Sequence, residues 1–369
     1  MAAVVEPALR IDCSTGFPAF LAQRRLALAL STYETGKLFV VGGGDGRRLA
    51  IVERSFPRAM GLWAAADGRR LWLATLFQLW QFEDALDTVA AIGPRDRLFV
   101  PRIAWTTGEL DIHDIAVDRR GRVLFVATRV NCIATLGQGK SFVPLWRPPF
   151  VSRLVPEDRC HLNGLALVAG EPAFATAVAD CDVADGWRDR RQDGGVVMDL
   201  RRDRVIARGL SMPHSPRWHA GRLWLLESGT GWLGSLDPET GRFEPLCFCP
   251  GYARGLAFVD GHAVIGLSRP RDVASFGGLP LEAELARRGA EPRCGVLVVE
   301  LATGIVRHWL RFSGVVGELY DLALVPGCAR PGLVGLKGED ICRVLVVGEP
   351  EPLFPDTEPP LVAGSVASR

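Results

Sequence analysis

Three histidines stand near the start of a sequence segment that recurs along the chain. They are His113 in LDIHDIAV, His161 in CHLNGLAL and His214 in MPHSPRW. Imidazole nitrogens bind transition metals and titrate near neutral pH, so three of them at one opening predict a metal site or an acid–base site. A third interpretation stays open, in which the rings only make hydrogen bonds to the neighbouring repeat.

Further polar and aromatic side chains accompany the histidines. Asp111 is expected to orient a histidine through its ring N–H, Arg254 to pair with an anionic group of a substrate, and Tyr320 to donate a proton or a hydrogen bond. The predicted set comprises catalytic groups (His113, His161, His214, Asp111 and Tyr320), metal ligands (His113, His161, His214 and Asn163) and substrate-binding groups (Arg254, Trp187, Ser215, Tyr252 and Glu227).

The spacing of the histidines leaves one geometric question. Side chains alternate across a strand, so His113 and His161 are expected to share a face that His214 does not. Pro213 and Pro216 flank His214, and a bend at these prolines would bring its ring to the same side.

The histidines belong to a repeat that predicts an all-β protein. Each copy has an apolar strand, a turn and a second apolar strand that ends in a small or hydroxylated residue. The copies begin roughly 40 to 65 residues apart, which fits a four-stranded antiparallel propeller blade better than a helical solenoid. Six copies are clear: 59–75, 112–128, 162–177, 214–228, 253–268 and 319–336.

The number of blades is open between seven and six. Residues 26–53 resemble a degenerate seventh copy, so we favour a seven-bladed single β-propeller over 1–355, with six blades as the alternative. Strands from the two ends of the chain are expected to close the ring, with 9–13 as an outer strand. Residues 356–369 are expected to form a flexible tail.

Two long connections are expected to roof the mouth of the central channel. They are 177–195 and 268–293, and both join the second strand of a repeat to the third. Trp187 lies within the first, where a polar surrounding suggests contact with a ligand.

Short helices are expected at 17–27 and 279–289. Asp114 and Asp321 are expected to be structural and to bond to the next blade.

Composition excludes several classes of protein. Of 369 residues, 48% are apolar and 23% are charged, with a formal net charge of +1. This balance disfavours a disordered regulator and a nucleic-acid binder.

No long apolar run or leader pattern is found, and the nine cysteines are an odd number, so a cytoplasmic protein with no membrane partner is expected. The GGGDG run at 42–46 joins two strands, and no nucleotide cofactor is expected.

Longer motifs resemble a family of bacterial conserved hypothetical proteins. The strings FPRAMGLW, LDIHDIAV, DVADGWRDRR, GLSMPHSPRW, FCPGYARGLAF and ELYDLAL carry this resemblance, which covers nearly all of 15–335. In that family the core sometimes accompanies tetratricopeptide repeats. The resemblance implies a fold and no reaction.

A more distant resemblance is to gluconolactonase-like and strictosidine-synthase-like propellers. LNGLAL is similar to their PNGLAW, which implies that Asn163 matches a metal-ligating Asn. MPHSPRW falls where they carry Pro-Asp-Gly, so His214 takes the place of a metal-ligating Asp, and their first-blade acidic ligand has no counterpart here. Imidazoles in place of carboxylates favour zinc, iron or copper over calcium.

Two functions follow from these features. The first is an enzyme for a small molecule at the channel mouth, with metal-dependent hydrolysis or isomerisation at a carbonyl as the reaction. The alternative is a non-catalytic platform for a peptide, glycan or protein.

Overall fold

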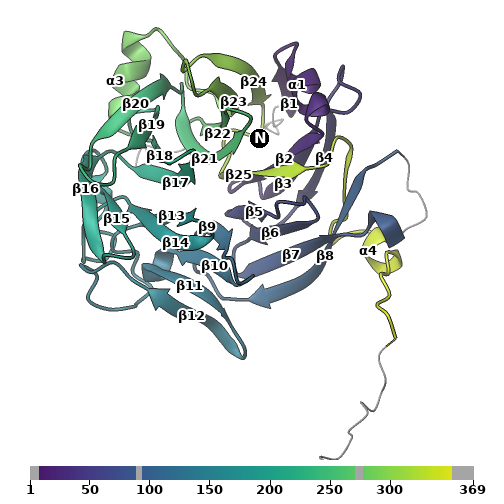
Figure 1. Ribbon diagram of the computed structural model, residues 1–369, viewed down its shortest axis with the longest axis horizontal. Helices are drawn as coiled ribbons and strands as arrows, with labels where there is room; N and C mark the ends of the chain where they lie inside the picture. Colours follow the sequence, from purple (N-terminus) through teal and green to yellow (C-terminus); the bar gives the residue numbers. More distant parts are fainter. Residues whose placement is uncertain (1–7, 89–93, 271–276, 351–369) are drawn as a thin grey trace, which may run out of the picture.

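The chain forms a ring of sheets around a central channel (Figure 1). The computed structural model describes residues 8–88, 94–270 and 277–350. Within these residues there are six sheets, each with a four-stranded antiparallel blade as its body. The innermost strands contact one another in the order β5, β9, β13, β17, β21, β25 and back to β5. The expected β-propeller is therefore confirmed.

Each blade runs from an inner to an outer strand. The blades, in ring order, are β5 (Leu62–Ala64), β6 (Arg70–Ala74), β7 (Gln78–Asp84) and β8 (Arg97–Thr106); β9 (Ile112–Val117), β10 (Val123–Ala127), β11 (Cys132–Gly137) and β12 (Lys140–Trp146); β13 (Leu162–Val168), β14 (Glu171–Ala177), β15 (Gly195–Asp199) and β16 (Arg204–Leu210); β17 (Pro213–His219), β18 (Arg222–Glu227), β19 (Trp232–Leu236) and β20 (Phe243–Phe248); β21 (Tyr252–Val259), β22 (His262–Ser268), β23 (Cys294–Glu300) and β24 (Val306–Ser313); β25 (Asp321–Pro326), β2 (Leu26–Thr32), β3 (Lys37–Gly42) and β4 (Ala50–Ser55).

The preference for seven blades is wrong, and the described residues form six. The presumed seventh copy supplies only β2, β3 and β4, and its inner strand is β25 from the far end of the chain, with Leu30 opposite Leu322. The copies at 26–53 and 319–336 are thus parts of one blade. The pairing of β2 with β25 leaves neither strand with an unpaired edge at this junction.

The ends of the chain extend two other blades. Strand β1 (Arg10–Cys13) pairs with β24, so it is an outer strand as expected, but β25 and not β1 closes the ring. Strand β26 (Pro331–Leu333) runs parallel to β8 at the edge of its blade. The expected flexible tail lies outside the described residues.

Helices are few and short. The two expected helices are confirmed as α1 (Phe17–Gln23) and α3 (Pro280–Arg287), and α4 (Asp340–Arg343) follows β26. Three 3-10 turns, η1 (Leu86–Thr88), η2 (Thr128–Val130) and η3 (Arg188–Arg190), complete the described elements. None of the helices in the described ranges has the length and apolar character needed to span a membrane. All nine cysteines are free thiols.

Buried hydroxyl groups join neighbouring blades. At the end of the second strand of a blade, a serine or threonine donates a hydrogen bond to a carbonyl at the start of the next inner strand. The hydroxylated residues that end three of the six sequence repeats, Thr128, Ser228 and Ser268, therefore have a role in assembling the ring. The bonds are Ser31 to Met60, Thr128 to Leu162, Ser228 to Ala253 and Ser268 to Leu319, with lengths of 2.5–2.8 Å.

Two buried aspartates make a second kind of link between blades. The carboxylate of Asp114 accepts the N–H of Leu165, and that of Asp321 accepts the N–H of Leu62, which confirms their expected structural role. Arg217 contacts both oxygens of Asp114, at 2.7 and 3.0 Å. Burial first, and the nearby charge of Asp114 second, raise the pKa of Asp321 to about 7.

The raised pKa of Asp321 predicts a stability that falls as pH rises. Between about pH 4 and about pH 7 the carboxyl of Asp321 is protonated in the folded protein, whereas in the unfolded chain it has already lost its proton. Asp321→Asn removes this titration, so its free energy of unfolding relative to wild type should rise by about 2 kcal/mol between about pH 5 and about pH 8. Urea unfolding across this range measures it.

Asp118→Asn is the matched control for this experiment. Burial acts to raise the pKa of Asp118, but hydrogen bonds from Arg122 and Arg120 outweigh it and leave the pKa below its ordinary value. The difference between this variant and wild type should therefore stay flat over the same range. A flat difference for Asp321→Asn as well would contradict the assignment.

Candidate functional site

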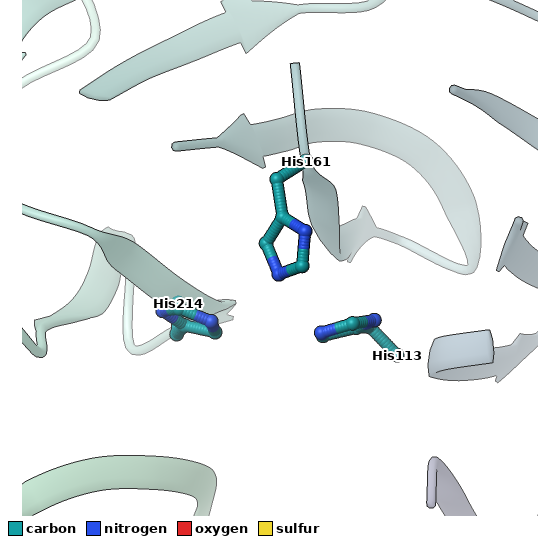
Figure 2. A group of neighbouring side chains, drawn as sticks. All are labelled: His113, His161 and His214. Atoms are coloured by element: carbon teal, nitrogen blue, oxygen red, sulfur yellow. The ribbon is translucent and has the colours of Figure 1, made fainter. Parts of the chain in front are cut away.

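The three predicted histidines converge in the mouth of the channel. His113 is the second residue of β9, His161 directly precedes β13, and His214 is the second residue of β17. All three are buried, and each offers a ring nitrogen within 4.8 Å of the other two. Figure 2 shows the rings turned toward one shared space. Three successive inner strands thus place three imidazoles at one point.

Local distortion of the strands accounts for this convergence. Simple alternation would turn His214 away from the other two rings, as the sequence indicated. The pairing of β17 with β18 shifts register between His214 and Arg217, and Ser215 has a φ of 51°. His161 itself has a φ of 51°. Such bulges re-aim side chains, and here they bring the ring of His214 to the side of the others.

Backbone carbonyls fix two of the rings. Nδ1 of His113 lies 3.0 Å from the carbonyl of Asp111, and Nδ1 of His214 lies 2.9 Å from the carbonyl of Met212. A carbonyl only accepts hydrogen bonds, so each Nδ1 must carry the proton. In a neutral ring the lone pair is then on Nε2. The hydroxyl oxygen of Thr128, 2.8 Å from Nδ1 of His113, is a second acceptor for the same proton.

A carboxylate fixes the third ring. Nδ1 of His161 donates to Oδ2 of Asp158 at 2.8 Å, which again leaves Nε2 of a neutral ring with the lone pair. The same oxygen accepts the indole N–H of Trp187 at 2.9 Å. Histidine ligands of metals commonly donate their second N–H to a carbonyl or carboxylate in this way.

Electrostatics favour an uncharged His113. Burial lowers the pKa of this ring well below its ordinary value, and the neighbouring His161, Arg254 and His214 lower it further. At neutral pH the ring therefore keeps the lone pair that a metal ligand or a general base requires.

The opposite side of the mouth carries Arg254 and two tyrosines. The guanidinium of Arg254 lies 4.9 Å from the ring centroid of Tyr320 and 5.3 Å from that of Tyr252. The ring of Tyr320 is 5.1 Å from that of His113, and the ring of Tyr252 is 5.7 Å from that of His214. The structure thus brings these three predicted residues to the histidine cluster.

Two predicted residues have different contacts from those expected. Asp111 orients His113 mainly through its backbone carbonyl, because its carboxylate is 3.8 Å from Nδ1. The amide oxygen of Asn163 accepts a hydrogen bond of 2.7 Å from Thr176, so the atom expected to bind a metal has a partner inside its own blade.

Two predicted substrate-binding residues make contacts that stabilise the fold. The hydroxyl oxygen of Ser215 accepts the N–H of Gly255 in the next blade at 3.0 Å. Glu227 accepts the N–H of Ser211 at 3.0 Å and the hydroxyl of Thr230 at 2.9 Å. Both residues therefore hold loops and strands around the mouth.

The described parts of the two long connections pack against each other beside the mouth. We call the loop 178–194 and helix α3 together the lid. Trp187 is only 4% exposed, and it stacks on His161 with ring centroids 4.1 Å apart. It packs in one apolar cluster with Leu279 and Leu281 from the α3 region. Trp187 is therefore a buried wall of the site in this state of the lid.

Sequence reasoning missed residues that hold the rings from behind. Asp158 binds His161 and Trp187 together, and its position three residues before His161 was the available signal. Thr128 was visible only as the hydroxyl that ends a repeat. Met212 acts through its carbonyl, for which no residue type gives a signal.

Replacing Asp158 tests how strongly this support stabilises the fold. Asp158→Ala leaves the buried N–H groups of His161 and Trp187 without their acceptor, so the free energy of unfolding should fall by about 1–3 kcal/mol. Chemical denaturation measures this loss. Asp193→Ala, at an exposed position of the loop that carries Trp187, should change it by less than about 0.5 kcal/mol. Equal effects at both positions would contradict the assignment.

Comparison with known proteins supports the fold. A chain in a crystal structure of a nidogen/laminin complex matches with a TM-score of 0.50 and 12% identity, over 82% of this chain and 99% of that chain. A protein of unknown function from Bacteroides caccae matches with a TM-score of 0.48 and 10% identity over the same shares. Among curated proteins, none matches. The family described as a domain of unknown function (DUF4915) matches residues 15–334, and the chain belongs to that family.

Proposed function

We propose that the protein is an enzyme for small molecules that holds one divalent transition metal through Nε2 of His113, His161 and His214. The observation that carries the proposal is the common tautomer of the three rings, each with its Nδ1 proton held by an acceptor. Three protein ligands leave a coordination position for water or substrate, as in catalytic zinc sites. Imidazole suits zinc, iron and copper better than calcium.

The spacing of the rings is close to what such an ion requires. A tetrahedral ion at about 2.1 Å from each nitrogen places those nitrogens about 3.4 Å apart. The ligand nitrogens here lie within 4.8 Å of one another. Binding of the ion would therefore draw the three nitrogens closer together.

The surrounding residues fit hydrolysis or isomerisation at a carbonyl. A bound metal would supply Lewis-acid polarisation of a carbonyl oxygen. Tyr320, whose ring adjoins His113, is the proposed donor of a proton or hydrogen bond to the developing oxyanion. The burial of the three rings strengthens the electrostatic interactions among the groups of the mouth.

The resemblance to gluconolactonase-like propellers supports the same location for the metal. In that comparison His214 takes the place of a ligating Asp, and LNGLAL supplies the neighbouring strand. The proposal differs from those enzymes in its ligand chemistry, because three imidazoles replace an oxygen-rich set.

Burial favours an enclosed small ligand over a large partner. The three histidines are at most 7% exposed, and Trp187 of the lid stacks on His161. A platform for a peptide or glycan needs its recognition groups on an open surface. We also propose that the protein is cytoplasmic, which is consistent with its free thiols.

Elemental analysis tests the metal site. Protein dialysed against zinc and then freed of excess ion should hold about one equivalent per chain, since three preorganised imidazoles form a strong site. His113→Ala, His161→Ala and His214→Ala should each lose most of it while circular dichroism shows the same β-rich spectrum.

His262→Ala is the matched control, because this ring lies outside the cluster and contacts the carbonyl of Asp260 and the ring of Phe20. It should bind as much zinc as wild type. Zinc content that is negligible in wild type, or equal in all the variants, would overturn the proposal.

A further inference from the structure

Arg254 is a buried cation, and two of its donor atoms lack a partner among the described residues. Its side chain comes from β21 into the mouth, and the residue is only 5% exposed. Nε and Nη1 are buried and have no hydrogen-bond partner among the described residues, and no carboxylate in the described ranges forms an ion pair with it. A buried charge in this condition is costly, and an anion that enters the mouth would offset the cost.

From this arrangement we infer that Arg254 binds the carboxylate of a small monoanionic substrate. The inference deepens the proposed function, because the reaction of the substrate rests on the metal proposed there. Binding of the carboxylate depends only on Arg254, so the carboxylate site and the metal site can fail separately.

The surroundings fix the direction of the guanidinium. Tyr252 and Tyr320 flank it at 5.3 and 4.9 Å, which holds a planar cation by interaction with the ring faces. A guanidinium positioned in this way presents its N–H groups as a fork, which matches the two oxygens of a carboxylate.

The charges nearby favour a monoanion over a dianion. Glu318 is 1% exposed, and its carboxylate accepts the backbone N–H groups of Tyr33 and Glu34 at 3.0–3.1 Å. Its negative charge and that of Asp111 both act on Arg254. Both acids repel an entering anion, and the repulsion grows with the charge of that anion, so a phosphate dianion is disfavoured about twice as strongly as a carboxylate monoanion.

The position of Arg254 then limits the substrate. Arg254 contacts Tyr320, and Tyr320 contacts His113, so a carboxylate on the arginine places the rest of a small molecule beside the histidines. Trp187 of the lid stacks on His161 beside these groups. The substrate class is therefore a short carboxylic acid with a carbonyl group a few atoms from its carboxylate.

Calorimetric titration of the wild-type protein with pyruvate, pyruvamide and inorganic phosphate tests the inference. Pyruvate should bind about tenfold to hundredfold more tightly than its neutral amide, which lacks the charge-assisted hydrogen bonds. Phosphate should bind more weakly than pyruvate. Equal binding of pyruvate and pyruvamide would overturn the inference, and tighter binding of phosphate would overturn the choice of a carboxylate.

Two variants locate the binding group. Arg254→Gln should reduce pyruvate affinity by about tenfold to hundredfold, and Arg254→Lys should reduce it less, since it keeps the charge but loses the fork. Arg204→Gln, at an exposed position of β16, is the control and should bind as wild type does. An Arg254→Gln variant with wild-type affinity would contradict the assignment.

The same titrations on protein treated with a chelator separate this inference from the proposed function. A preference for pyruvate over pyruvamide that persists without metal, and is lost in Arg254→Gln, supports the carboxylate site even if no metal binds. A zinc site that is present while pyruvate and pyruvamide bind equally supports the proposed function and overturns the carboxylate site.

Discussion

The hydroxyl of Thr128 links the assembly of the ring to the geometry of the site. It donates to the carbonyl of Leu162 in the next blade, and its oxygen accepts from Nδ1 of His113. Serines at three other blade junctions make the same inter-blade bond. A buried hydrogen bond that loses one partner costs about 1–3 kcal/mol. The positions of the inner strands, and with them the distances between the histidines, therefore depend on these buried bonds.

The mouth concentrates polar groups that a protein core otherwise avoids. His113, His161 and His214 are buried together, Arg254 lies across from them, and Trp187 covers them. Each ring has its Nδ1 proton held, whereas two donors of Arg254 have no partner among the described residues. A purely structural cluster would satisfy its buried donors. The imbalance is the physical basis for the proposed metal and for the proposed carboxylate.

Much of the fold was predictable from the sequence because each repeat shows its strands locally. The alternation of apolar residues, the turns between strands and the acidic anchors Asp114 and Asp321 all lie within single copies. The blade count was wrong because the pairing of β2 with β25 joins segments almost three hundred residues apart, and no local pattern reveals that contact. The histidine cluster was predicted, with a bend at the prolines that flank His214, and the structure has a register shift there. Asp158 and the left-handed Ser215 were not predicted, since neither a hydrogen-bonding partner nor a left-handed residue is marked by residue type.

The central claim is that three imidazoles present Nε2 to one ion. X-ray diffraction from crystals supplied with zinc, with data from both sides of the zinc absorption edge, tests it most directly. The account predicts one anomalous peak about 2.1 Å from Nε2 of His113, His161 and His214, with each Nδ1 still on its present acceptor. The absence of a peak among the three rings, or coordination through Nδ1, would contradict it.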